Sequence, residues 1–236
     1  MSTPDNNRVL LITGASTGIG RATAIQAVSE GWRVVLAARS AEKLAALEAE
    51  LGAERAMAVV CDVSDWSQQE EMVRKTIERF GRIDAVFANA GFSKGSSFIE
   101  GEHQPDEWRD MVLTNLFGAA ATARLTLPEL VKTKGHFLVT GSVLGRVTSI
   151  RNLYAATKWG VTGMAQAIRN EVAGMGVRVT LVEPGIVDTP FWEGLQKPVA
   201  PELHSEDVAR AVLFAINQPP HVDVSEIIIR PTGQAH

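Results

Sequence analysis

Short apolar runs and segments with helical periodicity alternate along almost the whole chain of 236 residues. The apolar runs lie at 9–13, 34–38, 56–61, 85–90, 137–140, 177–182 and 226–230. They are continuous, a pattern typical of strands that are buried on both faces of a parallel sheet. Strands and helices in turn, joined by right-handed crossovers, predict an α/β fold with a doubly wound parallel sheet.

The segments between the apolar runs carry helix start and stop signals. The segment after the second run begins with Ser40, a favourable N-cap residue, and ends at Gly52. The segment after the third run has apolar residues at helical spacing and ends at Gly81. We expect the later helices near 105–132, 153–174 and 205–217.

No linker rich in serine, glycine or proline divides the chain, so we predict one domain over residues 1–236. The densest loop signal is the segment 184–204, which contains four prolines. Long loops inside compact domains usually bind ligands, and we expect this one to be the substrate-binding loop.

Composition excludes several classes of protein. A net charge of −4 provides no basic surface for nucleic acid. No apolar run approaches the roughly 18 residues that a membrane span needs, and the first residues lack the apolar core of a signal peptide. The single cysteine, Cys61, excludes an internal disulfide and fits a reducing compartment, so we expect an inert buried thiol and a cytoplasmic protein.

A glycine-rich turn follows the first apolar run. The stretch TGASTGIG contains Gly14, Gly18 and Gly20, and a helical segment comes next. Glycines at a strand-to-helix turn let the backbone approach a pyrophosphate, whose charge the helix N-terminus stabilises. The spacing differs from the common Gly-x-Gly-x-x-Gly fingerprint, and the alternative is a tight turn without a ligand.

The only tyrosine, Tyr154, lies four residues before Lys158. Residues four apart share one face of a helix, so the pair could be an ordinary half-buried aromatic beside a lysine. It could also be an acid with a tuned proton affinity. A free tyrosine has a pKa near 10, and a nearby ammonium is expected to lower it.

Seven motifs now occur in one order: TGASTGIG, CDVSD (61–65), ANAG (88–91), LTNLFG (113–118), GSVLG (141–145), YAATK (154–158) and EPGIVDT (183–189). Their order and spacing resemble the short-chain dehydrogenase/reductase family over roughly residues 8–233. The resemblance implies a seven-stranded parallel sheet flanked by helices that binds NAD or NADP. Each motif alone is modest, and the set in register is specific.

The resemblance also implies roles for individual residues. The catalytic group would be Asn115, Ser142, Tyr154 and Lys158. Tyr154 would exchange the proton, Ser142 would place the substrate oxygen, Lys158 would hold the ribose, and Asn115 would hold a relay water. The implied cofactor contacts are Gly14, Ser16, Thr17, Gly18, Ile19, Gly20, Arg39, Ser40, Asp62, Val63, Asn89, Ala90, Gly91, Tyr154, Lys158, Pro184, Gly185, Ile186 and Thr189.

The end of the second apolar run favours NADP(H) over NAD(H). NAD-binding sheets of this type place a carboxylate there, which bonds the ribose 2′-hydroxyl. Here the position is Ala38, and Arg39 and Ser40 follow it. A guanidinium suits a phosphate because its donors form a fixed fork. The family's second basic position is Thr17 here, so that support is absent.

The expected activity is that of an NADP-linked alcohol dehydrogenase or carbonyl reductase acting on a small-molecule carbonyl or alcohol. A lyase of the halohydrin dehalogenase type and a non-catalytic dinucleotide sensor are the alternatives. The former would replace the lysine and lose the nucleotide-binding glycines, and the latter would lose the tyrosine. Two departures from the family concern the substrate side: Ser142 and Tyr154 are 12 residues apart, and Glu183 precedes Pro184.

The helices near 105–132 and 153–174 contain more small and apolar residues than one sheet face can cover. In the family these two helices pair across a twofold axis, so the resemblance implies a homodimer or homotetramer. No metal site is expected. Four residues are expected to line an apolar substrate pocket: Phe92, Leu144, Phe191 and Trp192.

Overall fold

The computed structural model describes residues 7–94, 97–99, 104–147, 153–195, 197 and 201–234. Over these residues, a seven-stranded sheet has the order β3-β2-β1-β4-β5-β6-β7, and all neighbouring strands are parallel. The strands are β1 (Val9–Thr13), β2 (Arg33–Ala38), β3 (Ala56–Val60), β4 (Ala85–Ala88), β5 (His136–Thr140), β6 (Arg178–Pro184) and β7 (Glu226–Ile229). The predicted doubly wound parallel sheet is confirmed.

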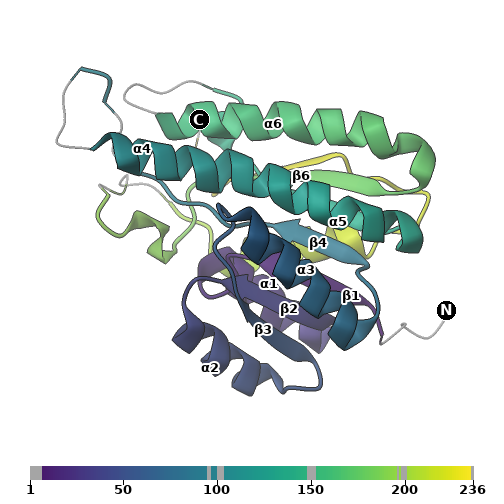
Figure 1. Ribbon diagram of the computed structural model, residues 1–236. Helices are drawn as coiled ribbons and strands as arrows, with labels where there is room; N and C mark the ends of the chain where they lie inside the picture. The colour runs from purple at the N-terminus through teal and green to yellow at the C-terminus, as the bar shows by residue number, and fades with distance from the viewer. Residues whose placement is uncertain are drawn as a thin grey trace.

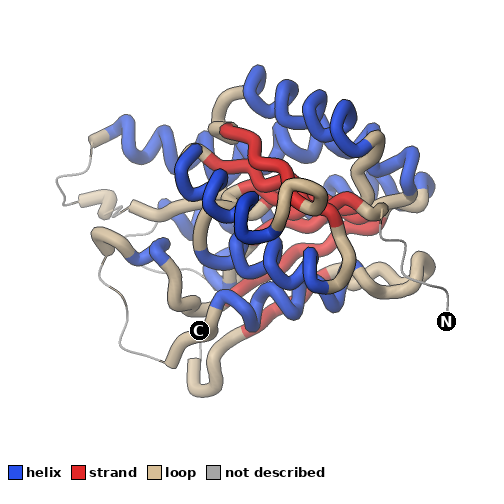
Figure 2. Tube along the Cα trace, turned by 90° about the horizontal axis from the view of Figure 1, so that it is seen from below, coloured by secondary structure: helices blue, strands red, loops and turns tan. Residues whose placement is uncertain are grey.

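Helices cover both faces of the sheet. The α-helices are α1 (Gly18–Ser29), α2 (Ala41–Leu51), α3 (Trp66–Phe80), α4 (Pro105–Val112), α5 (Ala119–Thr133), α6 (Leu153–Val172) and α7 (Ser205–Ile216). One apolar cluster joins the sheet to α1, α2 and α7, and a second joins it to α3, α5 and α6. Figure 1 shows α3, α5 and α6 along one face, and Figure 2 shows the strands between two layers of helices.

The start and stop signals act as predicted. Ser40 caps α2 by accepting a hydrogen bond from the backbone N–H of Lys43, and Gly52 follows that helix with a φ of +85°. Gly81 ends α3 in the left-handed region with a φ of +76°, which a residue with a side chain adopts at a cost.

The predicted single helix over 105–132 is wrong in its middle. A π-helix, Leu113–Gly118, separates α4 from α5. A π-helix forms where the chain holds one residue more than the α-helical ladder accommodates, and such segments occur frequently at functional sites. Asn115 lies within it, so the widened segment coincides with a predicted catalytic residue.

The two edge strands also depart from the expectation of burial on both faces. Val60 in β3 is 56% exposed and Ile228 in β7 is 46% exposed. An edge strand has a neighbour on one side only, and its apolar residues extend beyond the covering helices. Continuous apolar composition therefore predicted the strands correctly and overestimated the burial of these two.

The carboxyl ends of the strands form one edge of the sheet, and the loops that hold the predicted site residues leave from it. In Figure 1 the start of α6 lies at the opposite end of the molecule from the label of the N-terminus. Cys61 follows β3 and is buried, and the loss of hydration raises the pKa of its thiol to about 12. Within the described residues, the helices include none with the length and apolarity for a membrane span.

His136 is a buried titratable residue at the start of β5. Its Nε2 lies 2.7 Å from Thr180 Oγ1, and that hydroxyl donates to the carbonyl oxygen of Val224 at 2.5 Å. The second ring nitrogen is buried without a hydrogen-bond partner in the described part of the chain. Burial, with a smaller contribution from Arg178, lowers the pKa of His136 to about 3.

The depressed pKa of His136 makes folding pH-dependent. In the unfolded chain the His136 imidazole binds a proton below pH 6.5, and in the folded chain it does so only near pH 3. Its contribution to the free energy of unfolding is therefore largest above pH 6.5 and decreases as the pH falls. We expect the free energy of unfolding to fall by about 2 kcal/mol between pH 6.5 and 5 from this residue alone. His136→Gln should remove that part of the slope in urea titrations, whereas the exposed His221→Gln should not. Equal slopes for His136→Gln and the wild type would contradict the assignment.

Candidate active site

Asn89 holds three strand ends together at the carboxyl edge. Its backbone N–H donates to Thr13 Oγ1 at 3.0 Å, and its Nδ2 donates to the Thr13 carbonyl oxygen at 3.1 Å. Thr140 Oγ1 donates to Asn89 Oδ1 at 3.1 Å. These bonds connect the ends of β1, β4 and β5, so the turn after β4 holds the carboxyl edge of the sheet together.

The glycine-rich turn lies against Asn89 and Ala90. A Cβ on Gly14 would lie 2.9 Å from the Cα of Ala90, and a Cβ on Gly20 would lie 2.3 Å from the Gly14 carbonyl oxygen. Gly14 and Gly18 also have positive φ values of +67° and +52°. The turn therefore requires glycine for its own packing, and it brings the N-terminus of α1 to the carboxyl edge. Ser16, Thr17 and Ile19 are partly exposed in it.

The turn after β3 holds Asp62 and Val63 in place. Asp62 Oδ1 accepts hydrogen bonds from the backbone N–H and the hydroxyl of Ser64, at 2.9 Å and 2.7 Å. Gln69 Nε2 donates to the Val63 carbonyl oxygen at 2.6 Å and to that of Gly118 at 3.0 Å. A Cβ on Gly118 would lie 2.7 Å from Val63 Cγ2, so the π-helix packs directly on this turn.

The end of β2 is open to solvent. Ala38 is buried and Arg39 is exposed, and within the described residues the Arg39 guanidinium has neither a hydrogen bond nor an ion pair. Ser40 accepts the N-cap hydrogen bond from Lys43 N–H at 3.4 Å, which leaves its hydroxyl proton available. A free cation therefore stands where the sequence predicted one.

Three of the predicted catalytic residues lie together. The Ser142 hydroxyl lies beside the phenol of Tyr154, and Ser142 Oγ accepts from the backbone N–H of Leu144 at 3.1 Å. Lys158 is buried, and its Nζ donates to the Thr140 carbonyl oxygen at 2.7 Å and lies 5.5 Å from the centre of the Tyr154 ring. The end of β5, the turn after it and the first turns of α6 thus meet at one point.

The sequence predicted a lowered pKa for Tyr154, and that prediction is wrong. The protein around the phenol limits hydration of the phenolate and raises the pKa of Tyr154 above its usual range, and the bond to Ser142 partly opposes that rise. Burial also lowers the pKa of Lys158, to about 8. Desolvation acts on both charged forms and outweighs their attraction, because the ammonium is directed at Thr140.

Asn115 is close to this group but its side-chain amide is already paired. Its Oδ1 accepts from the backbone N–H of Phe92 at 3.0 Å, and its Nδ2 donates to the Phe92 carbonyl oxygen at 2.8 Å. A Cβ on Gly91 would lie 3.1 Å from Asn115 Oδ1 and 3.8 Å from Lys158 Nζ. The amide fixes the chain after Gly91, and the relay role stays a prediction.

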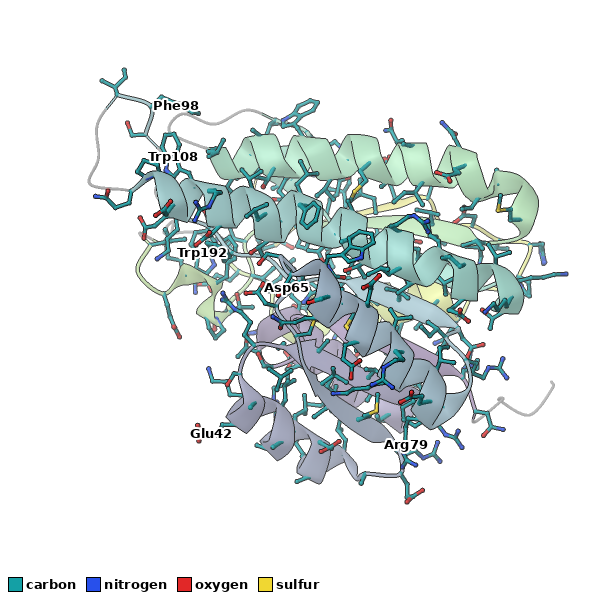
Figure 3. The ribbon with its side chains drawn as sticks, in the orientation of Figure 1. Glu42, Asp65, Arg79, Phe98, Trp108 and Trp192 are labelled. Atoms are coloured by element: carbon teal, nitrogen blue, oxygen red, sulfur yellow. The ribbon has the colours of Figure 1, made fainter. Side chains whose placement is uncertain are left out.

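The segment after β6 returns to the glycine-rich turn. Thr189 is the N-cap of the short 3₁₀-helix Pro190–Trp192, and a Cβ on Gly18 would lie 3.1 Å from Thr189 Cγ2. Trp192, labelled in Figure 3 near the same end of the molecule as Trp108, donates from Nε1 to the Val187 carbonyl oxygen at 2.9 Å. Residues 196 and 198–200 of the predicted substrate loop lie outside the described residues.

Phe191 is the residue of the predicted apolar pocket that reaches the catalytic group. Its ring packs edge-on against Tyr154 with the ring centres 5.5 Å apart, and Trp192 packs on Phe191 at 5.3 Å. Phe92 and Leu144 are also partly exposed. The backbone of Phe92 is bonded to Asn115, and the backbone N–H of Leu144 donates to Ser142.

Sequence reasoning missed several residues that hold the site. Gln234 accepts from the backbone N–H of Ile186 at 3.0 Å, and a Cβ on Gly185 would lie 2.2 Å from the same oxygen. Thr13, Thr140 and Thr157 hold Asn89, Lys158 and Asn115 through short polar contacts. Thr13 and Thr140 were visible in the sequence as polar residues at the ends of strands. Nothing in the sequence marked Gln234 as a residue that holds the site.

Comparison with known proteins agrees with this arrangement. A family model described as short chain dehydrogenase matches residues 8–200. An uncharacterized oxidoreductase of Staphylococcus aureus (strain USA300) is 36% identical over 227 residues, which is 95% of this chain and 97% of the relative.

Two solved structures are similar over nearly all of their length. An alcohol dehydrogenase from the archaeon Thermococcus sibiricus, complexed with 5-hydroxy-NADP, has a TM-score of 0.87 at 34% identity and covers 96% of this chain and 97% of its own. The closed form of a serine dehydrogenase complexed with NADP⁺ has a TM-score of 0.89 at 30% identity, with 97% and 96% covered. The chain belongs to the short-chain dehydrogenase family and is an oxidoreductase.

Proposed function

We propose that this oxidoreductase uses NADP(H) to interconvert a carbonyl compound and its alcohol, with Tyr154 as the general acid and base. The observation that carries the proposal is the meeting of Ser142, Tyr154 and Lys158 at the carboxyl edge of the sheet. Ligands of doubly wound sheets bind at that edge. The proposed cofactor and reaction agree with the NADP ligands of the two solved relatives.

The residues present fit a dinucleotide phosphate. A Cβ at Gly14 or Gly20 would fill the space beside Ala90 and the Gly14 carbonyl oxygen, so the turn keeps backbone N–H groups accessible at the start of α1. Arg39 would hold the 2′-phosphate. The position before it is Ala38, so no carboxylate repels the phosphate there, and the Arg39 guanidinium has no partner among the described residues. When bound, the nicotinamide supplies the hydride that reduces the carbonyl carbon.

The chain itself supplies orientation and the proton. Ser142 would donate to the substrate oxygen and place it beside the Tyr154 hydroxyl, which lies next to Ser142. Tyr154 is protonated at neutral pH and would give its proton to the carbonyl oxygen when the substrate is reduced. Lys158, anchored on Thr140, would steady the ribose and offset the negative charge that forms on Tyr154.

The alternatives have less support. A lyase of the halohydrin dehalogenase type would lack the glycine-rich turn and the lysine, and a sensor would lack the tyrosine. This chain has the turn packed on Ala90, Lys158 bonded to the Thr140 carbonyl oxygen, and Tyr154 packed against Phe191. Phe191 packs against Tyr154 and Trp192 packs on Phe191, which favours a substrate with an apolar group next to its carbonyl.

We also propose that the protein is a homo-oligomer. Phe117 and Trp159 are exposed on the π-helix and α6, and Phe214 and Ile228 are exposed on α7 and β7. A second copy of the chain could cover these exposed apolar side chains.

Tyr154→Phe should lower kcat by roughly 10²–10⁴, because the phenol supplies the proton. The affinity for NADPH, measured by fluorescence titration, should stay near the wild-type value, since the phenol makes little of the cofactor contact. Met175→Leu, at an exposed position after α6, serves as the control and should retain activity. A kcat of Tyr154→Phe above a few per cent of the wild type would identify another group as the acid.

Gly20→Ala should disrupt the glycine-rich turn, because its Cβ would lie 2.3 Å from the Gly14 carbonyl oxygen. We expect overpacking to cost about 1–3 kcal/mol in the free energy of unfolding, with loss of NADPH binding. Gly163→Ala is the matched control: nothing lies within 4 Å of its Cβ, and alanine inside a helix should stabilise by about 0.5–1 kcal/mol. Undiminished NADPH affinity in Gly20→Ala would remove the turn from the cofactor site.

Arg39→Ala should change cofactor preference. A charge-assisted hydrogen bond contributes about 1.5–3 kcal/mol, so KM for NADPH should rise roughly 10- to 100-fold. NADH has no 2′-phosphate, and its KM should stay nearly constant, which makes it the internal control. Wild-type kcat/KM values that are equal for NADPH and NADH would sink the assignment.

A further inference from the structure

Glu183, the penultimate residue of β6, is a fully buried carboxylate. Its exposed fraction is 0%. Arg146 Nε donates to both of its carboxylate oxygens, at 2.8 Å and 2.9 Å, and the Arg146 Nη2 lies 2.8 Å from Oε2. Thr162 Oγ1 lies 3.5 Å from Oε1. A buried carboxylate is costly unless it is paired and hydrogen-bonded, and Arg146 is the cation that pairs with it.

Arg146 belongs to the turn that carries Ser142. Its backbone N–H donates to the Val143 carbonyl oxygen at 3.0 Å, so it closes the 3₁₀-helix Val143–Gly145 whose N-cap is Ser142. Its guanidinium also pairs with Glu226 at the start of β7. The hydrogen bonds to Glu183 raise the pKa of Arg146 above its usual range. The Ser142 turn is thereby tied to β6 and β7.

Two glycines bring the partners of this ion pair close. A Cβ on Gly141 would lie 2.9 Å from Glu183 Cγ, and a Cβ on Gly145 would lie 2.8 Å from Thr162 Oγ1 and 2.9 Å from the Lys158 carbonyl oxygen. The turn between these glycines therefore rests on β6 on one side and on α6, at Lys158, on the other. Arg146 connects its end to β6 through Glu183, and Thr162 of α6 lies 3.5 Å from the same carboxylate.

We propose that the Arg146–Glu183 pair positions Ser142 against Tyr154 for catalysis. The inference rests on the proposed function, in which Ser142 orients the substrate oxygen. Neither residue is catalytic, since neither contacts the reacting groups. A buried ion pair contributes little net stability compared with an apolar pair of similar size, but it fixes geometry. The two-point contact of a guanidinium on a carboxylate is more directional than the contact of an ammonium.

Arg146→Lys tests orientation separately from charge. The ammonium keeps the charge balance around Glu183 but loses the two-point contact, so we expect a melting temperature close to that of the wild type. Because a misplacement of about 1 Å costs on the order of 10²-fold in rate, kcat should fall about 10- to 100-fold. KM for NADPH should change little, since the cofactor residues are untouched.

Arg146→Met and the double variant Arg146→Met/Glu183→Gln separate stability from positioning. The single variant leaves a buried carboxylate unpaired and should melt well below the wild type. The double variant removes both charges of the pair, including the buried one of Glu183, and should recover much of the melting temperature while kcat stays low. Lys132→Met, which breaks an exposed ion pair with Glu129 on α5, is the control and should change neither quantity. A kcat that recovers together with the melting temperature would show a merely structural role and overturn the proposal.

The single tyrosine provides a readout that is independent of activity. Protein labelled with fluorotyrosine should have one fluorine resonance, because Tyr154 is the only tyrosine of the chain. We expect Arg146→Lys to shift this resonance in the same direction as Ser142→Ala, and Lys132→Met to leave it in place. An unchanged resonance in Arg146→Lys would overturn the proposal whether or not the wild type reduces carbonyls. If the wild type reduces no carbonyl compound while Arg146→Lys still shifts the resonance, the proposed function is overturned. The effect of the ion pair on Ser142 would then still stand.

Discussion

The site depends on the hydrogen bonds of Asn89, which join the carboxyl ends of β1, β4 and β5. Parallel strands end at a common edge with unpaired backbone groups, and those groups must be satisfied by side chains or water. One amide satisfies the Thr13 carbonyl and also contacts the glycine-rich turn. The turn after β1 and the residues after β5 therefore have fixed places relative to each other, and the start of α6 packs on that frame through Lys158 and Thr140.

The strands and the helices between them could be predicted because each depends on a local signal: a continuous apolar run, an N-cap or a terminal glycine. The positions of Ser142, Tyr154 and Lys158 followed from the family resemblance, and the structure places the three together. The π-helix at 113–118 could not be predicted, since no local signal marks it; its last residue, Gly118, packs on Val63, far away in the sequence. The raised pKa of Tyr154 could not be predicted either, because desolvation depends on the surrounding atoms rather than on the neighbour four residues away.

Three ionisable side chains near the site are buried or partly buried, and each has a different kind of partner. Lys158 has a backbone carbonyl as partner and a lowered pKa. Glu183 has a guanidinium as partner. Tyr154 has a neutral hydroxyl as partner and an elevated pKa. Lys158 and Glu183 thus each have a local partner, and Tyr154, the proposed acid, keeps its proton at neutral pH.

The burial of Cys61 determines how the folded protein responds to thiol reagents. Alkylating agents and disulfides react with the thiolate, and with a pKa of about 12 this side chain is almost entirely protonated at neutral pH. It is also 1% exposed, and it is the only cysteine of the chain. A cysteine introduced at an exposed position would therefore be the one reactive thiol of the folded molecule, and a fluorophore or spin label could be attached there without first removing the native residue.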